Sequence, residues 1–163
     1  MAVLNGKESE KELHDLADDI FLYFGLGCRS ISKIYIPKDY DFVPFFEALD
    51  KYREIANLHS KYLNNLEYQK TVHLLNVTPF LDQGISVFKE NESLASPIGV
   101  IHYQYYKNMA DVEREILSLG ESLQCAVSNA IENSLFFPLG QSQYPKLSDY
   151  ANGIDTIDFL AKS

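Results

Sequence analysis

Hydrophobic and polar positions along the chain follow two different repeats, one typical of helices and one typical of strands. After a short apolar run at residues 2–4, apolar residues recur every three or four positions, as on one face of a helix. These positions are Leu13, Leu16, Ala17, Ile20, Phe21 and Phe24. Ser9 and Glu12 stand at the spacing of a capping box. We therefore expect a strand over residues 2–4, and a helix that begins after Ser9 and ends at Gly25.

The rest of the chain continues to alternate between short apolar runs and helical periods. We expect further strands over residues 32–36, 85–88, 100–105 and 123–127. We expect further helices from Asp39 or Asp41 to Ile55, over about 66–81, over 110–119 and over 149–161, and irregular chain over 136–144. Strands that alternate with helices and are apolar on both faces indicate a parallel sheet. The predicted fold class is therefore α/β, with a mostly parallel sheet covered by helices.

Composition narrows the function classes. The chain has 163 residues, enough for one compact domain, and its 14 basic and 23 acidic residues give a net charge of −9. Such an acidic chain lacks the basic surface that nucleic acids require. No apolar run approaches the roughly 18 residues of a membrane span, and no signal peptide is visible. We therefore expect a cytoplasmic protein that does not insert into membranes, with Cys28 and Cys125 as free thiols. The four histidines show no metal-ligand spacing, so no metal site is expected.

The stretch FGLGCRSISKIYIP, residues 24–37, contains the chemistry that stands out most in the sequence. Glycines beside Cys28 allow a substrate to approach the backbone and leave N–H groups free to bind an oxyanion. Arg29, or a local amide dipole, is able to favour the thiolate of the neighbouring cysteine. From the residues alone two interpretations stay open, a catalytic nucleophile and a structural cysteine in a glycine-rich turn.

The same stretch resembles the catalytic-cysteine segment of the aldehyde dehydrogenase superfamily. Residues 18–42, DDIFLYFGLGCRSISKIYIPKDYDF, are most similar to its acyl-CoA reductase branch, which is related to the bacterial bioluminescence fatty-acid reductases. Five further stretches agree with that branch, so the resemblance covers nearly the whole chain. They are HSKYLNNLEYQK (59–70), LLNVTPFLDQG (74–84), SLASPIGVIHYQYY (93–106), SLQCAVSN (122–129) and FPLGQSQYPKLSDYANGIDTIDFL (137–160).

This resemblance implies an aldehyde-dehydrogenase-like catalytic domain and a covalent mechanism. Cys28 would attack an acyl-CoA thioester, with its own backbone N–H in the oxyanion hole, and form an acyl-Cys28 thioester. NADPH or NADH would then reduce the thioester to a fatty aldehyde. Gly27 and Arg29 would contact the substrate. Glu92 would lie near the nicotinamide ribose, although its register before the 97–99 turn differs by about one residue from the family pattern. The resemblance also implies a homo-oligomer formed through this half of the enzyme.

The chain also departs from the family pattern. Family members carry a large cofactor-binding domain before the cysteine, whereas only 27 residues precede Cys28 here. We therefore expect residues 1–163 to form a single catalytic domain. The cofactor-binding domain, the general base and the remaining oxyanion donor would lie outside this chain. By itself the chain would bind no dinucleotide tightly and would turn over no substrate.

Two alternatives to the reductase remain open. In the first, Cys28 serves a thiol acyltransferase or hydrolase, with a base among His14, His59, His73 and His102. In the second, the chain is a non-catalytic oligomerisation or interaction domain whose C-terminal segment TIDFLAKS pairs with a partner. Dependence on a nicotinamide separates the reductase from the first alternative, and a Cys28→Ala variant separates both enzymes from the second.

Overall fold

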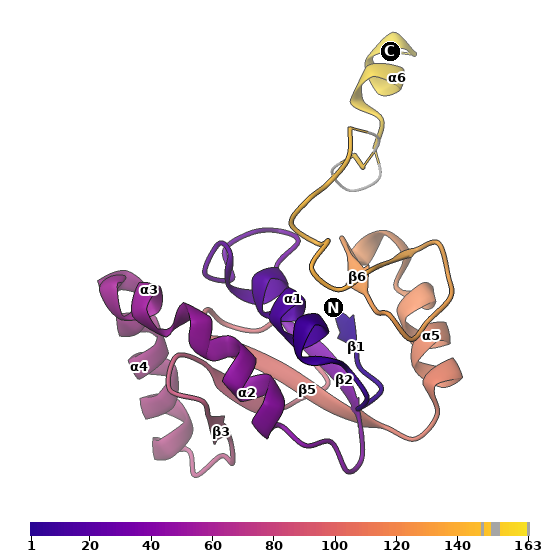
Figure 1. The fold of residues 1–163 in the computed structure, drawn as a ribbon. Coiled ribbons are helices and arrows are strands. Elements are labelled where there is room, and N and C mark those ends of the chain that lie inside the picture. The colour runs from indigo at the N-terminus through magenta and orange to yellow at the C-terminus, as the bar shows by residue number, and fades with distance from the viewer. Residues whose placement is uncertain (148, 151–153, 163) are drawn as a thin grey trace.

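A seven-stranded sheet forms the centre of the structure, a computed structural model that describes residues 1–147, 149–150 and 154–162 (Figure 1). The strands are β1 (Ala2–Val3), β2 (Lys33–Pro37), β3 (Leu81–Asp82), β4 (Val87–Glu90), β5 (Val100–Tyr106), β6 (Ala126–Val127) and β7 (Phe136–Phe137). Their order across the sheet is β3-β4-β5-β2-β1-β6-β7, and every neighbouring pair is parallel except β3 with β4. The α/β class with a mostly parallel sheet is therefore confirmed.

Helices cover both faces of this sheet. The helices are α1 (Glu10–Phe21), α2 (Val43–Leu49), α3 (Arg53–Leu58), α4 (Ser60–Leu75), α5 (Met109–Ser118) and α6 (Thr156–Ala161), with short 3-10 turns at Asp50–Tyr52 and Gly120–Ser122. α6 lies away from the sheet (Figure 1). Successive side chains of a strand point to opposite faces. Accordingly, Ala2 and Leu4 belong to the same apolar cluster as Leu16 of α1, whereas Val3 belongs to a second cluster with Ile116 of α5. α1 and α5 thus lie on opposite faces of β1.

The start of α1 agrees with its sequence pattern, but its end does not. Ser9 and Glu12 form the expected capping box, with the Glu12 carboxylate 2.7 Å from the Ser9 N–H and the Ser9 hydroxyl accepting from the Glu12 N–H. The helix ends at Phe21, and the chain turns through Phe24 (φ +54°) and Gly25 (φ +73°). Phe24 is apolar and keeps the helical spacing, but it lies in this turn. The expected helix end at Gly25 was therefore four residues too late.

The helix expected from Asp39 or Asp41 to Ile55 is broken into α2, a 3-10 turn and α3. Asp41 does serve its start, because its carboxylate accepts from the Val43 N–H at 2.9 Å. At the break, the Gln83 side chain donates to the Phe46 carbonyl at 3.1 Å and to the Asp50 carboxylate at 2.8 Å. A side chain from a distant loop thus supplies hydrogen bonds at the end of α2, which local periodicity does not predict.

The helix expected over 66–81 lies six residues earlier, as α4 (Ser60–Leu75). His59 caps its first turn, where the ring Nδ1 accepts from the Tyr62 N–H at 3.1 Å. A Schellman motif ends it, because the Thr78 N–H donates to the His73 carbonyl at 2.9 Å and the Val77 N–H to the Leu74 carbonyl at 3.1 Å. Both signals come from residue types that are uncommon in these roles, and the sequence pattern therefore misplaced both ends.

Several strand predictions also need correction. The strand expected over 85–88 lies at 87–90, as β4, and residues 123–125 run irregularly into the short β6. β3 and β7 were not predicted, and β7 lies inside the stretch 136–144 that was expected to be irregular. Strands of two residues show no periodicity, so no pattern marks them.

The C-terminal arm, residues 144–162 as far as they are described, leaves the body of the molecule and carries α6 (Figure 1). The helix expected over 149–161 is confirmed only as α6, Thr156–Ala161. Residues 149–150 and 154–155 are not helical, and 151–153 lie outside the described residues. Over the described parts of the chain, no helix has the length and apolar character needed to cross a membrane.

Candidate functional site

Cys28 lies in the loop that joins the end of α1 to the start of β2, and its side chain is exposed. The loop stands at the amino-terminal edge of the sheet, because the pocket beside it is lined by the residues directly before three parallel strands. These residues are Met1 before β1, Ser32 before β2 and Cys125 before β6. Ligands of open α/β sheets usually bind at the opposite, carboxyl-terminal edge. The candidate site is therefore built from loops that enter the strands.

The pocket at this edge has a volume of about 190 Å³. Its walls are Met1, Cys28, Arg29, Ser30, Ser32, Leu94, Ala95, Ser122, Leu123, Gln124 and Cys125. Within the described residues the backbone N–H of Cys28 has no hydrogen-bond acceptor, which leaves it available to a substrate oxygen. The arrangement thus offers an accessible thiol, a free backbone donor and a small cleft beside them.

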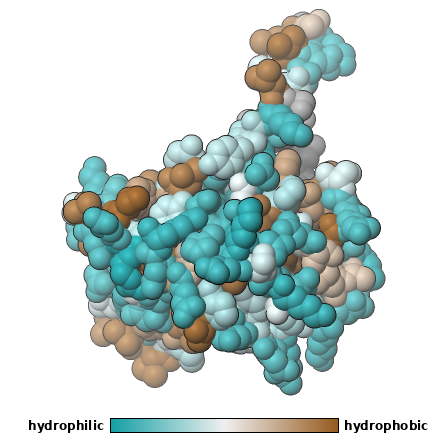
Figure 2. Space-filling model, in the orientation of Figure 1, coloured by the Kyte–Doolittle hydropathy of each residue, from teal (hydrophilic) through white to brown (hydrophobic). Residues whose placement is uncertain are grey.

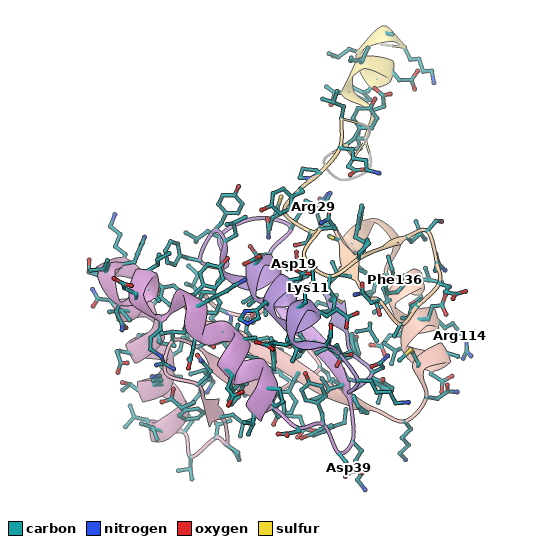
Figure 3. The ribbon with its side chains drawn as sticks, viewed as in Figure 1. Lys11, Asp19, Arg29, Asp39, Arg114 and Phe136 are labelled. Atoms are coloured by element: carbon teal, nitrogen blue, oxygen red, sulfur yellow. The ribbon has the colours of Figure 1, made fainter. Side chains whose placement is uncertain are left out.

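Arg29 lies next to Cys28 in sequence but its side chain is buried and serves other contacts (Figure 3). Its Nε donates to the Ser142 carbonyl at 2.6 Å, its Nη2 lies 3.8 Å from the Cys125 sulfur, and its Cζ lies 4.8 Å from the centre of the Phe137 ring. In the described residues Arg29 forms no ion pair. Arg29 instead links the Cys28 loop to β7 and the chain that follows it.

Asp19 of α1 holds that following chain from the other side. Its fully buried carboxylate accepts from the Gly140 N–H at 2.7 Å, the Ser142 N–H at 2.9 Å and the Ser142 hydroxyl at 2.7 Å. Burial raises the pKa of the Asp19 carboxyl, whereas the hydrogen bonds from Ser142 and Gly140 act to lower it. Figure 3 shows Asp19 on α1 and Arg29 near the base of the C-terminal arm. Together the two side chains fix residues 140–142 against the loop.

Gly27 fits closely into the same region. A Cβ atom at this position would lie 3.1 Å from the Ser30 hydroxyl and 3.4 Å from Oε1 of Gln143. The Gln143 side chain also donates to the Asp19 carbonyl at 3.1 Å and to the Ser30 hydroxyl at 3.3 Å. Gly27 therefore keeps the backbone beside Cys28 free of side-chain bulk, next to an amide that organises the loop.

Glu92 lies in the loop that joins β4 to β5, and it is exposed. Its backbone carbonyl accepts from the Nζ of Lys33 at 2.7 Å. Leu94 and Ala95 of the same loop line the Cys28 pocket, but the Glu92 side chain is not among the lining residues described above. The structure thus brings Cys28 and Arg29 to the pocket, with Gly27 beside Cys28, and gives Glu92 a backbone contact at Lys33.

A row of basic side chains crosses the sheet beneath that loop. Lys33 of β2, His102 of β5 and Lys89 of β4 are register partners on three neighbouring strands. Lys33 is fully buried and His102 nearly so, and the His102 Nδ1 lies 3.1 Å from the Ser93 carbonyl. Burial lowers the pKa of Lys33 and of His102, and the positive charges of Lys89 and Lys33 lower the pKa of His102 further.

The sequence pattern did not identify Asp19, Ser142, Gln143 and Lys33 as residues of the site. Two of them carried a signal. Asp19 stands three residues after Leu16, so this charged residue lies on the apolar face of α1. Lys33 is a charged residue in a strand expected to be buried on both faces. Ser142 and Gln143 lie in a segment expected to be irregular, where no repeat identifies contacts. Groups of three or more His, Cys, Asp or Glu side chains arranged for a metal ion do not occur among the described residues.

Comparison of the chain with protein-family models gave no match, and comparison with curated proteins gave no significant one. The geometry of the site and the motifs of the sequence therefore carry the functional argument.

Proposed function

We propose that this chain is the cysteine-bearing half of an acyl-CoA reductase with an aldehyde-dehydrogenase-like catalytic domain, in which Cys28 is the acyl-accepting nucleophile. One observation carries the proposal. Of the two cysteines, Cys28, which lies in the segment that resembles the catalytic-cysteine segment, is exposed on the wall of a pocket and has an unused backbone donor, whereas Cys125 is buried. The mostly parallel α/β sheet is compatible with this domain type.

In this proposal the described residues supply the nucleophile and one oxyanion donor of the acyl-transfer step. The Cys28 thiolate attacks the carbonyl carbon of the acyl-CoA thioester, and a carbon–sulfur bond forms. The backbone N–H of Cys28 stabilises the negative charge that develops on the oxygen. The bond to the CoA sulfur then breaks, CoA leaves as a thiolate that takes up a proton from solvent, and acyl-Cys28 remains. Gly27 adds no side chain to the backbone next to the reacting thiol.

The Cys28 pocket does not fit a dinucleotide. The Cys28 pocket of about 190 Å³ is smaller than the roughly 300 Å³ at which sites for drug-sized ligands begin. Glu92, the candidate partner of the nicotinamide ribose, presents its backbone to Lys33 and its side chain is exposed. In this proposal NADPH or NADH is therefore held by residues outside this chain.

The acyltransferase or hydrolase alternative is less well supported by the pocket. It needs a base next to Cys28, and none of the pocket's described wall residues is a histidine. His73 and His102 are buried elsewhere, and His59 caps α4. The interaction-domain alternative draws on one observation, the exposed apolar side chains of the C-terminal arm.

That arm supports a homo-oligomer as a second proposal. Leu147 is fully exposed, Ile157 is 77% exposed and Leu160 is 67% exposed, and Figure 2 shows apolar residues gathered on the protruding arm. Exposed apolar groups of this kind mark interaction surfaces. Light scattering of the wild type and of an Ile157→Ser/Leu160→Ser variant tests the proposal. We expect a wild-type oligomer and a monomeric variant, and a monomeric wild type would contradict it.

Acylation of the purified chain tests the proposed function. The reduced protein is incubated with octanoyl-CoA, and the intact mass and acidic peptide map are read under conditions that preserve thioesters. We expect one octanoyl group on Cys28 and none on Cys125 or on a Cys28→Ala variant. A stable adduct agrees with a reductase that awaits its hydride donor, whereas rapid release of octanoate supports the hydrolase. An unmodified Cys28 contradicts the acyl-transfer step.

A further inference from the structure

The two cysteines of the chain line the same pocket, although they are far apart in the sequence. Cys28 forms the exposed part of the wall and Cys125 the buried part, with 6% of its surface exposed. Arg29 joins them, because it follows Cys28 directly and its Nη2 lies 3.8 Å from the Cys125 sulfur. The loop that carries Cys28 is thus held beside Cys125 by a side-chain contact.

The environments of the two thiols differ in a way that suits sequential oxidation. Cys28 is reachable by small oxidants, whereas Cys125 is shielded from them. Burial raises the pKa of the Cys125 thiol, although the Arg29 charge acts against this shift. Oxidation therefore begins at Cys28, since exposure selects the thiol that meets a peroxide first.

We propose that Cys28 is a site of reversible oxidation and that Cys125 is its resolving thiol. The Cys28 sulfur attacks a hydroperoxide, the O–O bond breaks, and the products are a sulfenic acid at Cys28 and an alcohol or water. The Cys125 sulfur then attacks the Cys28 sulfur, an S–S bond forms, and the hydroxyl group leaves as water with the Cys125 proton. The peroxide accepts the two electrons that the sulfur atoms lose. A dithiol reductant reverses the reaction by exchange.

The disulfide requires the two Cα atoms to lie within about 7 Å of each other, and we propose that residues 22–28 shift to meet this limit. The backbone of this segment is suited to such a shift. Gly25 has φ +73° with open space around its Cα, and Phe24 already occupies the left-handed region at φ +54°. The anchoring of Arg29 keeps the end of the segment near Cys125 while the rest moves.

The pairing is a property of the two thiols and does not depend on acyl transfer. Its consequence, loss of the nucleophile from the acylation site, does rest on the proposed function. A Cys28 held in a disulfide has no thiolate for an acyl-CoA to meet, so the oxidised chain would be protected from acylation until it is reduced.

Peptide mapping of the peroxide-treated chain tests the proposal. The reduced 163-residue chain is treated with hydrogen peroxide, the remaining thiols are blocked with iodoacetamide, and intact mass and peptides are read without reductant. We expect the monomer to lose about 2 Da, one linked peptide pair containing Cys28 and Cys125, and full recovery with dithiothreitol. Matched Cys28→Ser and Cys125→Ser variants are treated in parallel with dimedone, which traps sulfenic acids. We expect a dimedone adduct on Cys28 in the Cys125→Ser variant, several-fold above wild type, and no reaction in the Cys28→Ser variant.

Equal dimedone labelling of Cys28 in wild type and Cys125→Ser, with no linked peptide, would overturn the proposal. So would disulfides found only between two copies of Cys28. Octanoyl-CoA labelling of the reduced chain is read separately, so the two proposals fail in different ways. A disulfide without acylation of the reduced chain contradicts the proposed function alone, and acylation without a disulfide contradicts the resolving role of Cys125 alone.

Discussion

The Asp19 carboxylate holds Ser142 by two hydrogen bonds, from the Ser142 N–H at 2.9 Å and from its hydroxyl at 2.7 Å. The pair joins the first helix of the chain to a segment more than a hundred residues later. The same segment accepts a hydrogen bond from Arg29 through the Ser142 carbonyl. Both ends of the loop that carries Cys28 are therefore fixed to residues 140–142. Asp19 of α1 fixes the start of the loop, and Arg29 fixes its end.

An Asp19→Asn variant is expected to lose about 2–3 kcal/mol of unfolding free energy. In asparagine an NH₂ group replaces one carboxylate oxygen. This group cannot accept a hydrogen bond from the Gly140 N–H or from the donors of Ser142, so a buried donor is left without an acceptor. Urea unfolding followed by circular dichroism measures the loss. Asp111→Asn is the matched control, because Asp111 forms an exposed ion pair with Arg114 and its loss should change stability by less than about 0.5 kcal/mol. Equal effects of the two variants would contradict the structural role of Asp19.

A Val77→Gly variant is expected to be more stable than wild type by about 0.5–1 kcal/mol. Val77 is 88% exposed and has φ +51° at the Schellman end of α4, a conformation that strains a β-branched residue and suits glycine. Removal of the strain outweighs the larger conformational entropy of an unfolded glycine. Thermal unfolding checks the gain, with Val77→Ala as the control that removes the branched side chain but keeps a Cβ. A Val77→Gly variant less stable than Val77→Ala would contradict the strain at this residue.

The sequence pattern predicted the fold class and the elements whose signals are local. The spacing of Ser9 and Glu12 predicted the capping box, the β-branched and aromatic run at 100–105 predicted β5, and the alternation of strands and helices predicted the α/β class. The structure confirms all three. The pattern failed where a contact from far along the chain decided the local structure. The Gln83 side chain supplies hydrogen bonds at the end of α2, and this pairing is not visible in the sequence around Phe46.

The candidate site likewise contains one residue that a local sequence signal predicted and several that depend on contacts from far along the chain. Cys28 was visible in the sequence because glycines beside a thiol are a local signal. The supporting residues were not visible, because the bonds from Asp19 to Gly140 and Ser142 span most of the chain. A sequence repeat reports which face of an element is buried, but it does not report which distant donor meets a buried carboxylate.

Stability is expected to fall as the pH is lowered from 7 to 5. The pKa of His102 in the folded state lies below its ordinary value of 6.5, mainly through burial, and the same holds for His73, which faces Lys89 and His102. Below pH 6.5 the unfolded chain therefore binds more protons than the folded chain, which favours unfolding. The raised pKa of Asp19 has the opposite effect on stability at lower pH. The contribution of His102 is therefore measured by comparing wild type with a variant.

Unfolding free energies of wild type and a His102→Gln variant at pH 5, 6, 7 and 8 measure this dependence. Glutamine keeps a donor for the Ser93 carbonyl and cannot be protonated, so the decline towards pH 5 should become shallower. His14→Gln is the control, because this side chain lies on the outer part of α1 with an exposed Glu10 as its neighbour. A decline in His102→Gln as steep as in wild type would show that the row of Lys33, His102 and Lys89 does not set the pH dependence.

Gly27→Ala and Gly25→Ala form a pair of variants that separates the shape of the Cys28 loop from its chemistry. Gly25 has φ +73°, so alanine there should reduce the unfolding free energy by about 1 kcal/mol. Gly27 lacks a positive φ, and its added Cβ meets only the ends of the Ser30, Gln143 and Tyr23 side chains, so stability should stay within about 0.5 kcal/mol of wild type.

On the basis of the proposed function, the two variants should rank in the opposite order for the rate of acylation, with the larger effect at Gly27. A methyl group at residue 27 meets the Ser30 hydroxyl and the Gln143 amide and shifts the backbone next to the Cys28 N–H, so we expect the rate of acyl-Cys28 formation to fall on the order of tenfold. Gly25→Ala, assayed well below its unfolding temperature, should keep a rate within about twofold of wild type, because open space surrounds that position and no substrate contact is assigned to it. The rate is measured by intact mass during incubation with octanoyl-CoA. If Gly27→Ala reacts as fast as wild type, Gly27 serves only the turn and the acyl group approaches Cys28 from another side.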